Sequence, residues 1–225
     1  DDNPHGWAYT SSIKQHLSGN EEPLITHADH YKTNRAYGVA AYSKGEVLVE
    51  QLGAVLGSEV RDRGMRRYFK EWAFKHPGPH DFKRVMERES GLELDWYFQY
   101  MMHTTDAIDY AVESVVNSQG TVTVELSQRG NMPMPQDVTL TWEDGTTTSV
   151  HIPLVMMRGH RPLSEGEILG EDWPWVNPAS QLNVPANGRL TSVEVDAQGL
   201  QADIHRENNV LEFDLTKDQE ARQPH

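Results

Sequence analysis

The sequence predicts an α+β protein in which a helical half is followed by a small antiparallel β-sandwich. Up to about residue 108, apolar residues recur at spacings of three and four, whereas beyond it they alternate with polar ones. The charge changes there too: residues 1–110 hold 13 basic and 17 acidic residues, and residues 111–225 hold 7 and 17. We therefore expect a helical domain at 1–108, a β domain at 109–216 and a polar tail at 217–225.

Two consecutive helices are expected between residues 43 and 72. The first covers 43–56, and Gly57 ends it, as glycine often does at a helix C-terminus. The second begins at Ser58. Apolar residues recur at helical spacing in both; they are Val47, Leu48, Leu52, Val55 and Leu56 in the first helix, and Val60, Met65, Tyr68, Phe69 and Trp72 in the second.

The second helix also has a strongly basic face, which consists of Arg61, Arg63, Arg66, Arg67 and Lys70. Such a face could bind an anion or a nucleic acid, or it could be a solvated surface balanced by nearby acids. The net charge of the chain is −14, and nucleic-acid binding needs a basic field. We therefore favour the solvated surface and expect no nucleic-acid partner.

Two shorter helices complete the helical half. One is expected over 81–90, after a turn rich in Pro and Gly at 76–80. The next is apolar on nearly all sides, which predicts that it is buried among its neighbours; it contains Leu94, Trp96, Tyr97, Phe98, Met101 and Met102.

The second half predicts strands joined by tight turns. Glu143-Asp144-Gly145 predicts a hairpin, because Asp-Gly readily adopts the positive φ of primed turns. The stretch 157–188, rich in Gly, Pro and acids, is expected to be a loop. Strands are expected at 109–116, 122–126, 138–142, 146–152 and 190–195, with a last one within 202–213.

The composition excludes several classes of protein and site. The chain has no Cys, which excludes disulfides, a thiolate zinc site and a Cys nucleophile. No apolar run approaches the ~20 residues that span a bilayer, so membrane insertion is not expected. An acidic chain without Cys is compatible with the periplasm, the cell exterior and the cytoplasm, and among these we favour a bacterial periplasm or cell envelope. The chain begins with Asp1 rather than Met, so we expect a mature form or a piece of a longer protein.

Two groups of residues are candidates for a functional site. His27, Asp29 and His30 could hold a metal ion, since two imidazoles three residues apart can lie on one side of a helical turn. The other candidate is Tyr42, expected at the start of the first helix. A phenol beside the positive end of a helix could donate a hydrogen bond to a developing negative charge. Alternatively, Tyr42 and Tyr37 merely pack the loop.

The run Tyr42-Ser43-Lys44-Gly45, preceded by Tyr37 five residues earlier, resembles a motif of the aminopeptidase N-like zinc peptidases, or gluzincins. In that family a Tyr-x-Lys-Gly motif opens a helix. The resemblance is good over roughly 24–110 and implies that the helical half is the late part of a gluzincin catalytic domain. Similar segments follow in the same order at 52–57, 68–72, 81–82, 90–91 and 94–96, with a weaker one at 203–209.

The resemblance implies an activity and a site. In the family, a zinc-bound water attacks the first peptide carbonyl of a peptide with a free N-terminus. The motif tyrosine donates a hydrogen bond to the resulting oxyanion, which implies this role for Tyr42. Tyr37 is a candidate for a supporting position beside it. The resemblance thus implies zinc in the complete protein and a peptide as its substrate.

The sequence also departs from the family pattern. The HExxH zinc ligands, the general-base Glu and the Gly-x-Met-Glu-Asn segment are not among these 225 residues. The resemblance therefore implies the C-terminal part of a peptidase that holds no metal and is inactive in isolation. An exposed apolar face on its helical half, and self-association through that face, are expected. The alternatives are a stand-alone module that binds peptides or a partner protein, and a metalloprotein that uses His27, Asp29 and His30.

Overall fold

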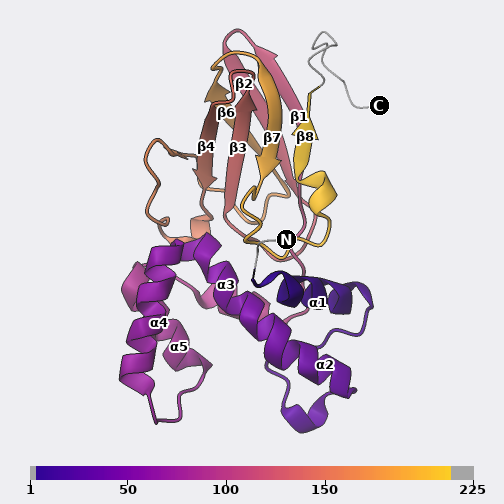
Figure 1. Cartoon of the computed structure of the whole chain (residues 1–225), viewed down its shortest axis with the longest axis vertical. Helices are drawn as coiled ribbons and strands as arrows, with labels where there is room; N and C mark the ends of the chain where they lie inside the picture. The colour runs from indigo at the N-terminus through magenta and orange to yellow at the C-terminus, as the bar shows by residue number, and fades with distance from the viewer. Residues whose placement is uncertain (1–3, 214–225) are drawn as a thin grey trace. The chain divides into compact units, whose positions relative to one another are not determined.

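The computed structural model describes residues 4–213, and this part of the chain forms two compact units (Figure 1). A helical unit contains the residues up to Ala107, together with Met156–Pro162 and Leu200–Ile204. A β unit contains the remainder. Two short segments that the sequence assigned to the β domain therefore lie in the helical unit. The α+β class is confirmed, and the predicted tail at 217–225 lies outside the described residues.

The helices α3 to α6 lie close to their predicted positions, whereas α1 was not predicted. Only Ala8, Tyr9 and Gln15 are buried in α1, too few to give a helical apolar pattern. None of the helices in residues 4–213 is both long and apolar enough to cross a bilayer. The helical unit contains α1 (Gly6–Leu17), α2 (Asn34–Gly38), a π-helical turn (Val39–Lys44), α3 (Gly45–Leu56), α4 (Ser58–Trp72), α5 (Pro79–Ser90) and α6 (Asp95–His103).

The helix that carries Tyr42 begins earlier than expected. Thr33 caps it, since the Thr33 hydroxyl accepts a hydrogen bond from the Ala36 N–H at 3.1 Å. Helical backbone then continues through the π-helical turn to Leu56. The prediction that Tyr42 lies at the positive end of a helix is therefore wrong, because that end is about two turns away. Glycines within the segment, which weaken a helical pattern, concealed its continuity.

Helices α3 and α6 form the core of the helical unit. Leu52 and Val55 of α3 are fully buried, and so is Tyr97 of α6. The Tyr97 hydroxyl donates to the Leu48 carbonyl at 2.7 Å. Burial raises the pKa of Tyr97 well above its usual value, because the phenolate would lose its hydration. The prediction that α6 is buried among its neighbours is confirmed.

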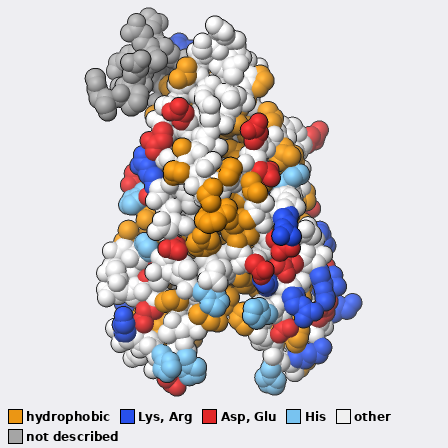
Figure 2. Space-filling view, turned by 180° about the vertical axis from the view of Figure 1, so that it is seen from behind, with side chains coloured by type: hydrophobic (Ala, Val, Ile, Leu, Met, Phe, Trp, Pro, Cys, Tyr) orange, Lys and Arg blue, Asp and Glu red, His pale blue; other side chains and the backbone are white. Residues whose placement is uncertain are grey.

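The basic face of α4 is a set of surface ion pairs. Arg67 lies 2.7 Å from Glu71 and 2.7 Å from Glu89, and Arg63 lies 2.9 Å from Glu89. Acidic side chains accordingly lie among the basic ones over α4 and α5 (Figure 2). This confirms a charge-balanced surface. Phe69, however, is 72% exposed rather than on the apolar face.

The β unit contains two sheets (Figure 1). One has the order β1 (Tyr110–Ser118), β2 (Thr121–Gln128), β6 (Ala179–Pro185). The other has the order β5 (Ile168–Leu169), β4 (Thr147–Ile152), β3 (Gln136–Trp142), β7 (Leu190–Val195), β8 (Val210–Glu212). The Asp144-Gly145 turn joins β3 to β4, as predicted.

Alternate residues of the strands fill the interior of the β unit. Val124 of β2, Leu140 of β3 and Val193 of β7 are fully buried. Two details differ from the prediction of an antiparallel sandwich with a long loop. Strand β5 pairs with β4 in parallel, and β6 lies within the stretch expected to be a loop. Only two residues of β6 are buried. The alternation of apolar and polar residues is therefore too short to predict a strand.

Gly64 allows α4 and α5 to pack closely, since a Cβ there would lie 2.5 Å from Sδ of Met86. We expect Gly64→Ala to lower the free energy of unfolding by about 1–2 kcal/mol, because overpacking outweighs the gain in helix propensity. The matched control is Gly38→Ala. It has no neighbouring atom within 4 Å and should raise that free energy by ~1 kcal/mol. Urea unfolding followed by circular dichroism measures both, and equal effects would contradict the packing argument.

Glu89 makes the stability of the helical unit depend on pH. Hydrogen bonds from Arg67 and Arg63 lower the pKa of its carboxyl. A carboxyl whose pKa is lower in the folded than in the unfolded state stabilises the fold when the pH is above its unfolded-state pKa. This stabilisation is lost as the pH falls through its folded-state pKa. Glu89→Gln should therefore melt below the wild type at neutral pH, and the two melting temperatures should converge in strong acid. A difference that persists in acid would contradict this assignment.

Candidate active site

Tyr42 projects from the π-helical turn that joins α2 to α3. Its side chain is 73% exposed, whereas Ser43 and Lys44, the next two residues, are 1% and 6% exposed. The turn therefore presents a phenol to solvent and turns its two neighbours into the protein. An exposed phenol that is carried on helical backbone is suited to contact a bound molecule.

The π-helical turn also changes the relation between Tyr42 and Tyr37. Its hydrogen bonds close over five residues, as in the bond from the Gly45 N–H to the Ala40 carbonyl. Residues five apart lie about 140° apart around an α-helix, and the wider turn reduces this angle. Tyr37 and Tyr42 thus come closer to one side of the helix than α-helical geometry would place them. Turns of this kind occur frequently at functional sites.

Tyr37 is fixed by aromatic packing. Its ring, in a residue that is 41% exposed, meets the ring of Tyr31 edge-on, with centroids 5.6 Å apart. The Tyr31 hydroxyl lies 3.1 Å from the Pro23 carbonyl and 3.2 Å from the Leu24 carbonyl, to which it donates. Burial and the charge of Glu22 raise the pKa of Tyr31, which keeps it a hydrogen-bond donor. These contacts hold Tyr37 in place while leaving the residue partly exposed.

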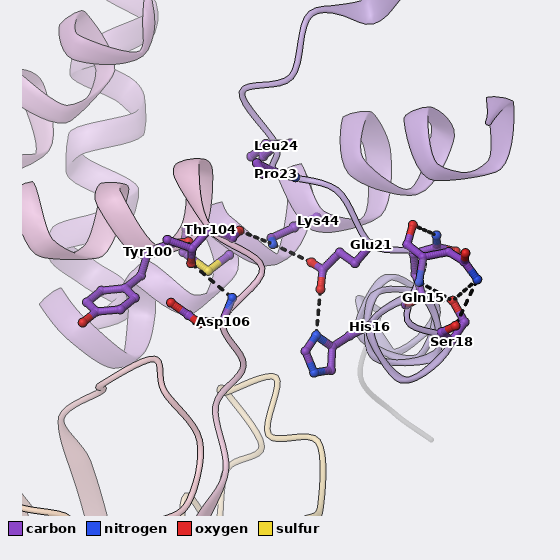
Figure 3. Close-up of polar contacts among 12 residues, drawn as sticks. Gln15, His16, Ser18, Glu21, Pro23, Leu24, Lys44, Tyr100, Thr104 and Asp106 are labelled. Atoms are coloured by element: carbon purple, nitrogen blue, oxygen red, sulfur yellow. Dashed lines mark hydrogen bonds and ion pairs between the residues drawn. The ribbon is translucent and has the colours of Figure 1, made fainter. Parts of the chain in front are cut away.

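A buried ion pair lies beneath the turn (Figure 3). The Lys44 Nζ lies 2.5 Å from Oε1 of Glu21 and donates to the Thr104 carbonyl at 3.4 Å. The second carboxylate oxygen of Glu21 lies 2.8 Å from Nδ1 of His16. The Lys44 and Glu21 side chains are 7% and 11% exposed. This network joins the turn to α1, to the loop after α1 and to the end of α6.

Sequence reasoning did not identify Glu21 or His16. Glu21 precedes Lys44 by 23 residues in an acidic loop, and no local motif connects the two. The available signal was Lys44 itself, since a lysine inside an apolar helical pattern needs a partner once it is buried.

His27, Asp29 and His30 do not form a metal site. His27 lies 3.8 Å from the carboxylate of Asp29, and both side chains are largely exposed. Among residues 4–213, no three His, Cys, Asp or Glu side chains converge so as to hold a metal ion. The described residues therefore do not fit a zinc site, and the interpretation of the chain as an independent metalloprotein has no support.

Comparison with known proteins relates the helical segment that carries Tyr42 to a peptidase domain. A peptidase family M1 domain matches residues 5–103, the segment that carries α1 to α6 and Tyr42. The helical segment is therefore similar to a peptidase family M1 domain. The resemblance of the Tyr-x-Lys-Gly segment to the aminopeptidase N-like gluzincins is thereby confirmed.

The chain matches only a small part of two known aminopeptidases. Aminopeptidase N of Haemophilus influenzae is 28% identical over 123 residues, which are 50% of this chain and 14% of that protein. Legionella pneumophila aminopeptidase A, crystallised with aspartic acid, matches 86% of this chain and 21% of its own, with a TM-score of 0.55 and 12% identity. The second likeness concerns the fold alone. The chain therefore spans about a fifth or less of these relatives.

The buried ion pair predicts a pattern of stability changes. Lys44→Met or Glu21→Leu alone should each lower the free energy of unfolding by about 3–5 kcal/mol, because each leaves a buried charge without its partner. The double variant should lose clearly less than the sum of the two, since it leaves neither charge behind. Urea unfolding measures all three. Additive losses would show that Lys44 and Glu21 do not interact.

Proposed function

We propose that this chain forms part of the active site of an aminopeptidase, and that Tyr42 donates a hydrogen bond to the tetrahedral oxyanion formed at the scissile carbonyl. The observation that carries the proposal is the placement of Tyr42. Its exposed phenol stands on a π-helical turn, within the residues that match the M1 domain, over a buried and paired Lys44.

The chemistry of a tyrosine suits this role. A phenol hydroxyl donates one hydrogen bond, and its rigid ring has few rotatable bonds to fix. Donors that are placed before the reaction stabilise developing charge without reorganising. Because Tyr42 faces solvent, a substrate bound over the turn could receive its hydrogen bond.

The proposed substrate is a peptide with a free N-terminus, since both relatives are named aminopeptidases. The match to the peptidase family M1 domain supports zinc as the cofactor of the complete protein. Because residues 4–213 do not supply a ligand set, the proposal places that zinc on residues outside this range. The isolated chain is then expected to be inactive.

A second candidate function is a stand-alone module that binds peptides or a partner protein. Exposed aromatic residues of the helical unit favour it, since large exposed apolar side chains often mark contact surfaces. Trp7 is 73% exposed, Phe69 72% and Phe74 fully so. Self-association of the helical unit through such residues stays a prediction, and analytical ultracentrifugation over a range of concentrations would test it.

The size of the polypeptide in its source cells distinguishes the two functions. An immunoblot against this chain should show a band far above 25.6 kDa if the chain works within a complete peptidase. A single band at 25.6 kDa would contradict the peptidase proposal and favour the binding module, because no zinc ligands would be present.

Replacing Tyr42 tests the proposed chemistry. In the full-length protein, Tyr42→Phe should lower kcat about 10²–10³-fold, as loss of one oxyanion donor usually does, with little change in KM. Steady-state kinetics on unblocked amino-acid 4-nitroanilides measures this, and elemental analysis should show unchanged zinc content. Tyr68→Phe, which removes a phenol hydroxyl from α4, is the matched control and should keep wild-type rates. Wild-type turnover in Tyr42→Phe would contradict the proposal.

A further inference from the structure

We propose that Lys44 is a positioning residue, and that its buried ion pair with Glu21 holds the π-helical turn in the form that directs Tyr42 outward. The inference rests on the proposed function, because it concerns how the same tyrosine is placed. It assigns a task to a buried charge that the oxyanion chemistry itself does not use.

The direction of Tyr42 depends on the π-helical turn. Hydrogen bonds in this turn close over five residues, whereas the α-helix on either side closes them over four. If the turn relaxed to α-helix, the backbone on one side of it would rotate by about 100°, one residue's step, relative to the other. Tyr42 would then no longer point where it does with respect to α3.

Unfavourable features gather at this turn. The Ser43 hydroxyl is buried and has no hydrogen-bond partner among the residues described. Lys44 and Glu21 are charges withdrawn from water. An α-helix with apolar residues at 43 and 44 would avoid these costs. Structural costs that coincide at one place are typical of segments whose geometry is required for function.

The groups that bind Lys44 are themselves held in place, and this prevents the turn from rotating. Its ammonium bonds the Glu21 carboxylate and the Thr104 carbonyl. Glu21 is in turn held by His16 of α1 at 2.8 Å. Thr104 is held at the end of α6, since its hydroxyl donates to the Tyr100 carbonyl at 2.9 Å. Relaxation of the turn would move Lys44 away from these groups and leave its charge unpaired in the interior.

A double-mutant cycle in the full-length protein tests the inference. The variants are Lys44→Met, Tyr42→Phe and the two combined, assayed for kcat and KM on unblocked amino-acid 4-nitroanilides. Lys44→Met should lower kcat about 100-fold with little change in KM, because a misplaced catalytic group costs about this much. In the Tyr42→Phe background the same change should cost less than about twofold, since there is no phenol hydroxyl left to position.

Each other outcome overturns the inference. A kcat loss from Lys44→Met that is equally large in both backgrounds would mean that Lys44 acts on folding or on another group. An unchanged kcat in Lys44→Met would mean that it positions nothing. Wild-type turnover in Tyr42→Phe would instead overturn the proposed function itself and, with it, the role given to Lys44.

Control variants separate positioning from general damage. Lys70→Met removes an exposed lysine from α4 and should leave both constants unchanged. If Lys44→Met fails to fold, Glu21→Gln removes the same ion pair from the other side and should show the same loss of kcat and the same dependence on Tyr42. Lys44→Arg keeps the cation and should recover part of the lost rate. Failure of Glu21→Gln to affect kcat would contradict the inference.

Discussion

The buried ion pair between Lys44 and Glu21 is the constraint on which the proposed site depends. A charge inside a protein must keep its partner, so α1, the loop that follows it and the end of α6 are all held against the π-helical turn. In the proposed arrangement, the π-helical turn sets the direction of the Tyr42 phenol. The buried ion pair would then control the chemistry that this surface offers.

The rest of the helical unit is built for stability. Gln51 shows the contrast, because it is as deeply buried as Ser43 but both ends of its amide are satisfied. Its oxygen accepts from the Ala202 N–H at 2.6 Å, and its nitrogen contacts Sδ of Met101 at 3.5 Å. Among the described residues of this unit, the buried side-chain polar atom without a hydrogen-bond partner is the Ser43 hydroxyl, and Ser43 is the residue next to Tyr42. The energetic cost of this buried hydroxyl and the proposed function therefore lie at the same turn.

The match to the M1 domain ends at residue 103, whereas the likeness of fold to an aminopeptidase covers 86% of the chain. A β-sandwich requires alternating apolar residues and suitable turns, and many sequences meet these requirements. Under the proposed function, the helical unit would also need Tyr42, Lys44 and Glu21 at defined places. A family match that covers this unit is consistent with that additional requirement.

The α+β class, helices α3 to α6, the hairpin at Asp144-Gly145 and the choice of Tyr42 as the candidate could all be predicted from the sequence. These features depend on periodicity, turn chemistry and a motif, all of which lie within a few residues of one another. The helix start at Asn34, the π-helical turn, strand β6 and the partner of Lys44 could be seen only in the folded chain. The periodicity of apolar residues indicates which side of a segment is buried, but not which residues pack against that side. The ion pair of Lys44 with Glu21 joins residues 23 positions apart, so it can be identified only in the folded chain.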